Sequence, residues 1–146
     1  MLPATVSRVK SNTAQSVNNC IRRQTERNVA RVAAAGRPAI DRRLSELDEE
    51  WDIERLLETM APSFTLLGLT LGLTVDRRWF AIPLIVQAFF LQHALQGWCP
   101  PIPVLRRLGV RTMEEIDEER YALKALRGDF ERIEQSAMSA LQAARA

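Results

Sequence analysis

Cysteine and histidine are scarce in this sequence, which contains Cys20, Cys99 and a single histidine, His93. The two cysteines lie far apart, so they form neither a CxxC redox pair nor a disulfide framework. Two cysteines and one histidine at this spacing do not indicate a zinc site either. We therefore expect no metal ion and no cofactor.

Several other signals are missing. The first ten residues lack the apolar core of a signal peptide, so we expect that the N-terminus is not exported by cleavage. Arg23, Arg27 and Arg31 share one helical face, but no aromatic residue lies among them and no nucleic-acid-binding motif appears. We therefore expect no nucleic acid partner. There is also no internal repeat and no low-complexity tract.

Two apolar runs, Met60–Val75 and Trp79–Trp98, dominate the middle of the chain and are divided by Asp76, Arg77 and Arg78. A membrane-spanning helix needs about 20 mostly apolar residues. The second run meets that length without a charged residue, and tryptophan at its two ends is typical of a membrane interface. The first run reaches this spanning length only if it starts near Leu56, which places Glu58 near the lipid headgroups. These runs predict a membrane helical hairpin.

A soluble alternative is a buried helical hairpin inside a bundle, which would suit the mean hydropathy of −0.14. That average, however, is lowered by long charged flanks. The flanking helices offer only narrow apolar stripes, too little to cover such a hairpin on all sides. The fold class we predict is therefore all-α, with a membrane helical hairpin and flanking amphipathic cytoplasmic helices.

Charge is unevenly distributed before the hairpin, with a net +6 over residues 1–37 and −5 over residues 38–60. We expect one helix from about residue 13 to 35 and a second from about 38 to 59, separated by Gly36 and Pro38. The apolar face of the second helix is formed by Ile40, Leu44, Leu47 and Trp51. Its acidic face either contacts the arginine-rich first helix or faces solvent, and the basic segment either pairs with it or rests on anionic lipid. Pro62 marks the expected entry into the membrane.

Three prolines follow Cys99 within four residues and predict a rigid exit from the hairpin, with Arg106 and Arg107 reaching toward headgroups. Thr112 and Glu115 have the spacing of a capping box that opens a last helix. We expect this helix to reach about Ala140, weakened at Gly128, with a seam of Leu123, Leu126, Phe130, Ile133, Ala137 and Ala140.

The segment Gly97-Trp98-Cys99-Pro100, followed by Leu108-Gly109-Val110-Arg111-Thr112, resembles the YgaP-like inner-membrane domain. That bacterial two-helix domain is sometimes fused to a rhodanese module and often stands alone. The resemblance covers roughly residues 55–112, and residues 1–54 are too short for a rhodanese module. It implies a membrane hairpin at 55–112. The residue pattern of the flanks adds a cytoplasmic helix pair at 1–54 and an amphipathic helix at 113–146. It establishes no activity for the stand-alone members.

Polar and small residues inside the hairpin are the next candidates. Gln92, His93 and Gln96 lie in one wedge of the second helix, either as interhelical hydrogen-bond partners or, through His93, as a proton carrier. We favour the first interpretation because no acidic partner lies within the hairpin. Gly68 and Gly72 form a close-approach motif that serves either the hairpin itself or a dimer.

Cys99 is the one candidate nucleophile, although a small apolar residue at an interfacial turn is the simpler interpretation. We therefore predict a non-catalytic scaffold or interaction protein of the bacterial inner membrane, with both termini cytoplasmic. Its expected partners are the lipid bilayer and either a second copy or another membrane protein. The alternatives are a thiol-dependent sulfur carrier or transfer accessory that uses Cys99, and a small oligomeric permeation unit lined by the polar wedge.

Overall fold

The computed structural model describes residues 4–130 and 139, and every regular element within this part is helical. The chain divides into two compact units, one formed by residues 1–21 and 51–114 and the other by residues 22–50 and 115–146. The three-part division at 1–54, 55–112 and 113–146 stays a prediction. Each unit is described by itself below.

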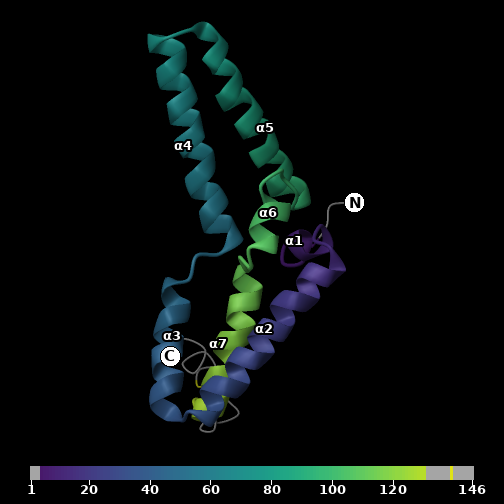
Figure 1. The fold of residues 1–146 in the computed structure, drawn as a ribbon, viewed down its shortest axis with the longest axis vertical. Coiled ribbons are helices and arrows are strands. Elements are labelled where there is room, and N and C mark those ends of the chain that lie inside the picture. Colours follow the sequence, from purple (N-terminus) through teal and green to yellow (C-terminus); the bar gives the residue numbers. More distant parts are fainter. Residues whose placement is uncertain (1–3, 131–138, 140–146) are drawn as a thin grey trace. The chain divides into compact units, whose positions relative to one another are not determined.

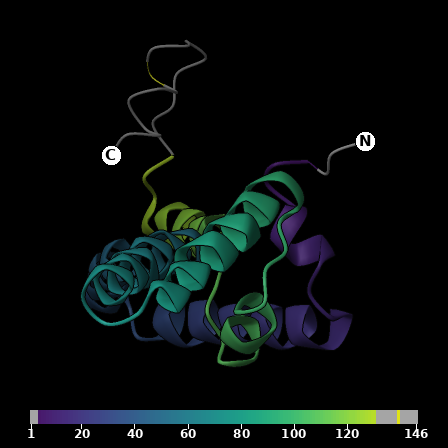
Figure 2. The ribbon, with the colours of Figure 1, turned by 90° about the horizontal axis from the view of Figure 1, so that it is seen from above.

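The first unit contains two long apolar helices, α4 (Ile53–Thr74) and α5 (Ala81–Gln96), joined through the short 3-10 helix η1 (Arg77–Phe80). They run side by side from this connection (Figure 1), which Figure 2 views from above. The turn forms where the sequence predicts it, because the carboxylate of Asp76 accepts a hydrogen bond from the N–H of Arg78 at 2.8 Å. We call α4 and α5 the α4–α5 pair.

Two helical stretches, Arg37–Thr74 and Arg77–Gln96, contain windows long and apolar enough to cross a membrane. The first stretch includes α4 and the second includes α5. Only 22% and 11% of these windows are buried inside the described structure. The core helices of a soluble bundle would be mostly buried, so this low burial argues against the soluble alternative.

The α4 helix begins well before the position that the sequence predicts. The Asp52 carboxylate caps it by accepting the N–H of Arg55 at 2.8 Å, and the N–H of Ile53 donates to the carbonyl of Arg111 at 3.0 Å. Pro62 therefore lies inside the helix, and its role as an entry point into the membrane stays a prediction. Trp51 falls in the break before α4, where 44% of it is exposed, so it does not extend the apolar face of the preceding helix.

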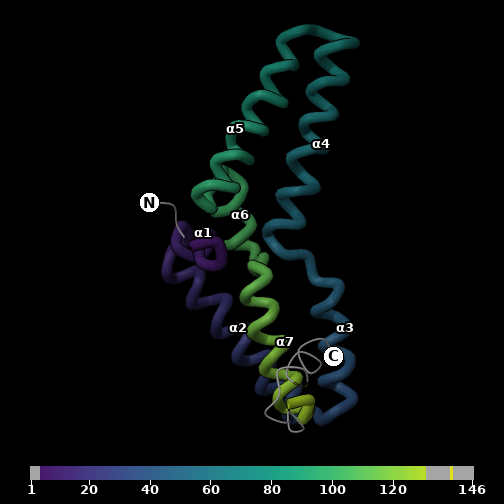
Figure 3. Tube along the Cα trace, turned by 180° about the vertical axis from the view of Figure 1, so that it is seen from behind, coloured from purple at the N-terminus to yellow at the C-terminus, as the bar shows by residue number. Residues whose placement is uncertain are grey.

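A small core closes the open end of the α4–α5 pair. It combines α1 (Arg8–Ser11) and α6 (Ile102–Arg107) with the first residues of α4 (Figure 3), and its buried side chains are Val9, Ile53, Leu57, Cys99 and Ile102. Gly97 ends α5 with φ +75°, and a Cβ built there would lie 2.5 Å from the backbone of Arg8. Only glycine suits this position, because it combines a left-handed conformation with a close backbone approach.

The second unit packs the later part of α2 (Gln15–Ala34) with α3 (Arg37–Glu49) and α7 (Met113–Arg127). Gly36, with φ +85°, separates α2 from α3, and Pro38 lies in the first turn of α3 as predicted. The core is built from Val32, Ile40, Leu44, Leu47, Ile116 and Leu123. The apolar face predicted for the second helix is thus confirmed for its first three members.

Ion pairs join α3 to α7. Asp41 pairs with Arg127 at 2.8 Å, and Asp48 pairs with Arg120 at 3.1 Å. Arg27 and Arg31 instead donate hydrogen bonds to side chains of their own helix, α2. The acidic helix is therefore engaged by α7, which the sequence reading did not anticipate.

The last described helix begins at Met113, directly after Thr112, but it ends at Arg127. Gly128 has φ +91°, which stops the helix and does not merely weaken it. Leu126 is 55% exposed, so the predicted seam is already interrupted at its second position. Ile133, Ala137 and Ala140 lie outside the described residues.

Gly68 and Gly72 are buried inside the α4–α5 pair. A Cβ at Gly68 would lie 2.5 Å from Cδ of Pro83, and a Cβ at Gly72 would lie 2.7 Å from the ring of Phe80. The glycine face of α4 is therefore occupied by η1 and α5 of the same chain.

We expect Gly68→Ile to separate α4 from α5, since the new side chain overlaps Pro83 and Ile82. Overpacking of this kind costs about 1–3 kcal/mol or more. The measurement is the thermal midpoint of the helical circular dichroism signal in mild detergent, which should fall by several degrees. Leu69→Ile is the control because Leu69 is exposed. Equal midpoints for the two variants would contradict the packing described here.

Candidate functional site

Three ionisable side chains meet where α1 reaches the end of the α4–α5 pair. Glu54 lies in the first turn of α4, His93 in the last turn of α5, and Arg8 at the start of α1. Oε2 of Glu54 lies 2.7 Å from Nε2 of His93, and its Oε1 accepts a hydrogen bond from Nη2 of Arg8 at 2.8 Å. One carboxylate thus connects three helices that are far apart in sequence.

The His93 ring is almost completely enclosed, with 1% of the residue exposed. It stacks on Phe90 with ring centroids 6.4 Å apart. When Nε2 carries the proton that it shares with Glu54, Nδ1 is left as an acceptor. Nδ1 of His93 and Nε of Arg8 are buried and have no hydrogen-bond partner among the described residues. The network thus joins one carboxylate to a guanidinium and an imidazole.

The three residues of the predicted polar wedge differ in burial. His93 is buried, Gln92 is half-buried and Gln96 is exposed. The backbone carbonyl of Gln96 accepts a hydrogen bond from Asn12 at 2.8 Å, which also fastens α1 to this end of α5. Their joint role stays a prediction.

Sequence reasoning missed the partners of His93. Glu54 was not expected to belong to the hairpin because the first apolar run was predicted to start no earlier than about Leu56. Once α4 starts at Ile53, Glu54 belongs to its first turn and faces His93. The hydrogen bond between the two apolar helices was missed as well: Gln87 donates to the Thr65 hydroxyl at 2.7 Å.

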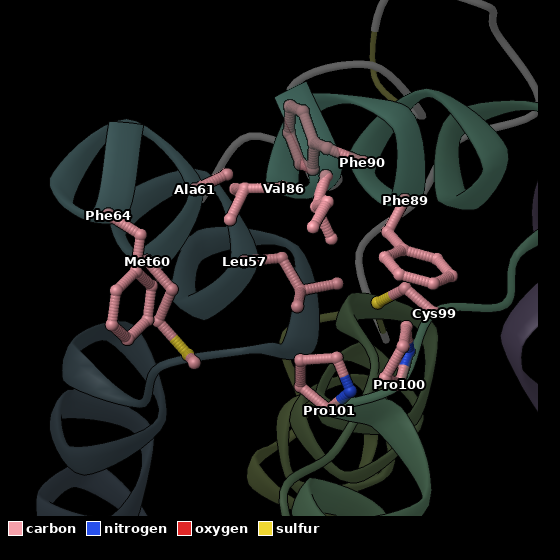
Figure 4. A pocket seen from close by; sticks show the side chains of 11 residues that line it. Leu57, Met60, Ala61, Phe64, Val86, Phe89, Phe90, Cys99, Pro100 and Pro101 are labelled. Atoms are coloured by element: carbon pink, nitrogen blue, oxygen red, sulfur yellow. The ribbon is translucent and has the colours of Figure 1, made fainter. Parts of the chain in front are cut away.

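An apolar pocket of about 290 Å³ lies between α4 and α5, next to the prolines that follow Cys99 (Figure 4). The α4 and α5 faces that line it continue, one helical turn farther, to Glu54 and His93. The lining consists of Leu57, Met60, Ala61, Phe64, Ile85, Val86, Phe89, Phe90, Cys99, Pro100 and Pro101.

Cys99 is 3% exposed and belongs to the small core as well as to the pocket wall. Burial raises the pKa of its thiol, and the nearby Glu54 carboxylate acts in the same direction. The guanidinium of Arg106 is buried and donates to the Val110 carbonyl and to Asn18. For this reason Arg106 does not reach toward headgroups, whereas Arg107 is exposed.

We expect Cys99 to be alkylated slowly, with a pH midpoint above that of the same thiol in unfolded protein. At a pH between the thiol pKa of the unfolded chain and the higher pKa of the folded chain, the unfolded chain loses its proton and the folded chain keeps it. The free energy of unfolding therefore decreases as the pH rises above the thiol pKa of the unfolded chain. The measurement is the rate of iodoacetamide labelling against pH in Cys20→Ser, folded and in denaturant. A folded midpoint below about 8.5, the value for a free thiol, would contradict this result.

Among the described residues, no group of three or more histidine, cysteine, aspartate or glutamate side chains is placed to bind an ion. The candidate site is therefore the Glu54–His93–Arg8 network with its neighbouring pocket. In comparisons with protein-family models, curated proteins and solved structures, this chain matches none.

Proposed function

We propose that this protein is a non-catalytic, integral membrane scaffold whose α4–α5 pair crosses the bilayer as a helical hairpin. Its remaining helices lie on one side of the membrane and bind a second copy or another membrane protein. The resemblance to the YgaP-like domain supports a bacterial inner-membrane setting for this role.

One observation carries the proposal: the two apolar windows are long enough to cross a membrane, yet only 22% and 11% of them are buried. The exposed hydroxyl groups of α4 are compatible with this placement because they are satisfied within their own helix. Each donates to the carbonyl four residues earlier at 2.7–2.8 Å, and the four residues concerned are Thr59, Ser63, Thr70 and Thr74. Water would solvate these groups at no cost, whereas hydrocarbon requires internal partners. Large apolar side chains surround them, such as Leu73 at 79% and Leu84 at 74% exposed.

Basic residues support an orientation with both termini in the cytoplasm. Positive charge within a short distance of a span favours the cytoplasmic side. The connection between α4 and α5 holds Arg77 and Arg78. Arg37, Arg42 and Arg43 lie before the pair, Arg55 lies in the first turn of α4, and Arg106, Arg107 and Arg111 follow the pair.

A scaffold role fits the described chemistry better than either alternative. Sulfur transfer needs an accessible thiolate, and Cys99 is buried with a raised pKa. A pore needs polar groups along one path, and Gln92 and Gln96 differ in burial from His93. A scaffold needs neither, and the second unit supplies helices held together by their own core and ion pairs.

Membrane insertion predicts that the protein stays in the pellet when a membrane fraction is extracted with alkaline carbonate. Release into the supernatant would contradict it. Reporter fusions to each terminus test the orientation: both are expected to be active only with a cytoplasmic reporter. Periplasmic activity from either fusion would contradict the proposed topology without affecting insertion.

A further inference from the structure

The pocket between α4 and α5 is lined by apolar side chains, including the two sulfur-containing ones of Met60 and Cys99. Its volume of about 290 Å³ is nearly twice that of an engineered apolar cavity of about 150 Å³ that excludes water and takes up benzene. Water therefore gains no hydrogen bonds by entering, and leaving the space empty forfeits the dispersion contacts of every lining atom. An apolar ligand would therefore fill this pocket more favourably than water.

The pocket opens onto the same apolar surface of the α4–α5 pair that the proposed function places in hydrocarbon. Phe64 at 46%, Ile85 at 55% and Phe89 at 37% exposed lie both in the wall of the pocket and on that outer surface. The lining side chains converge from both helices and from the Cys99–Pro101 turn (Figure 4). The bilayer interface is thus continuous with the interior of the pocket.

The size of the space decides between a slender chain and a helix. An α-helix with side chains is about 10–12 Å across, far wider than a space of this volume allows. Taking a methylene group as similar in size to the ~30 Å³ share of one water molecule, the pocket holds about ten of them. That matches part of one lipid acyl chain.

We propose that the pocket is a binding site for one acyl chain of a bilayer phospholipid. The chain enters sideways between α4 and α5 and ends against Leu57 and the Cys99–Pro101 turn. This proposal rests on the proposed membrane insertion, and it adds that one lipid is held as part of the first unit.

The test uses the full chain in vesicles of phosphatidylethanolamine and phosphatidylglycerol that contain a phospholipid with a diazirine on its acyl chain. After illumination, mass spectrometry locates the cross-links. We expect labelling of the pocket residues Leu57, Ala61 and Pro101 as well as of the outer residues Leu73 and Leu84.

Ala61→Trp fills the pocket and should lower labelling of Leu57 and Pro101 at least fivefold, with Leu73 and Leu84 unchanged. Ala88→Trp is the matched control, since Ala88 is exposed on α5 and lies outside the pocket lining; it should leave pocket labelling unchanged. If Ala61→Trp does not reconstitute, Ala61→Leu takes its place, and labelling of Leu57 and Pro101 must still fall.

The remaining outcomes separate the two proposals. Labelled outer residues with an unlabelled pocket would overturn the acyl-chain site and leave insertion standing. Pocket labelling that Ala61→Trp does not reduce, or pocket residues cross-linked to a second copy of the chain, would also overturn the site. Absence of lipid labelling on Leu73 and Leu84 as well would overturn the membrane insertion itself.

Discussion

Glu119→Ala is expected to disrupt the second unit, with the largest stability effect of any single charge removal in the described structure. Glu119 is completely buried, and Arg43 donates to its two carboxylate oxygens at 2.8 and 3.3 Å. Removing one partner of a buried pair costs about 3–5 kcal/mol. Arg43 keeps Glu46 at 3.0 Å and Glu50 at 3.7 Å as partners, so we expect the lower end of this range. The free energy of opening α3 and α7 should fall by that amount.

Hydrogen–deuterium exchange of the α3 and α7 amides in the full chain measures this opening. A loss of about 3 kcal/mol raises exchange by a factor of about 100. Glu118→Ala is the matched control: Glu118 is the preceding residue of α7 and is exposed, so exchange should hardly change.

The double variant Arg43→Met with Glu119→Leu tests the physical cause. It removes both charges and keeps apolar volume, and replacements of this kind are often neutral or stabilising. Exchange should return close to that of the unaltered chain, apart from the loss of the bond that Arg43 makes to Glu46 at 3.0 Å. A double variant as unstable as Glu119→Ala would show that a different contact of Glu119 is decisive.

Much of the fold was predictable from the chain because it follows from local signals. Two long apolar runs, the charged turn at Asp76, and the Gly36–Pro38 break each have a local physical cause, and each is found in the structure. The start of α4 was not predictable in the same way. Asp52 is the residue that caps it, but it lies in a run of acids where any member satisfies the same local rule.

The charge pairs described above were harder still, because they join residues 39 to 86 positions apart. A signal for Glu119 nevertheless exists: it stands between Ile116 and Leu123 on the face that packs into the core. A charged residue on an apolar face indicates a buried partner. For Glu54 the corresponding signal is its place between Ile53 and Leu57, which are both buried.

Glu54→Leu is expected to release α1 from the α4–α5 pair. The change leaves Nη2 of Arg8 and Nε2 of His93 without the carboxylate that both contact. A hydrogen bond to a charged group contributes about 1.5–3 kcal/mol. Glu54 is about a third exposed, so solvent reduces the gain from each contact toward the lower end of that range. Val9 and the bond from Asn12 to Gln96 still hold α1 in part.

Tryptic cleavage after Lys10 in the detergent-solubilised full chain measures the release, since α1 must open before the protease can cut. A loss of about 1.5 kcal/mol raises the cleavage rate about tenfold. Glu58→Leu, at an exposed acid one turn farther along α4, is the control and should cleave like the unaltered chain. His93→Phe keeps the contact between Arg8 and Glu54 and should fall between the two. Equal cleavage rates for Glu54→Leu and Glu58→Leu would contradict this prediction. They would show that the contacts of Val9 and Asn12 are sufficient to hold α1 and that the Glu54 carboxylate is not needed for this.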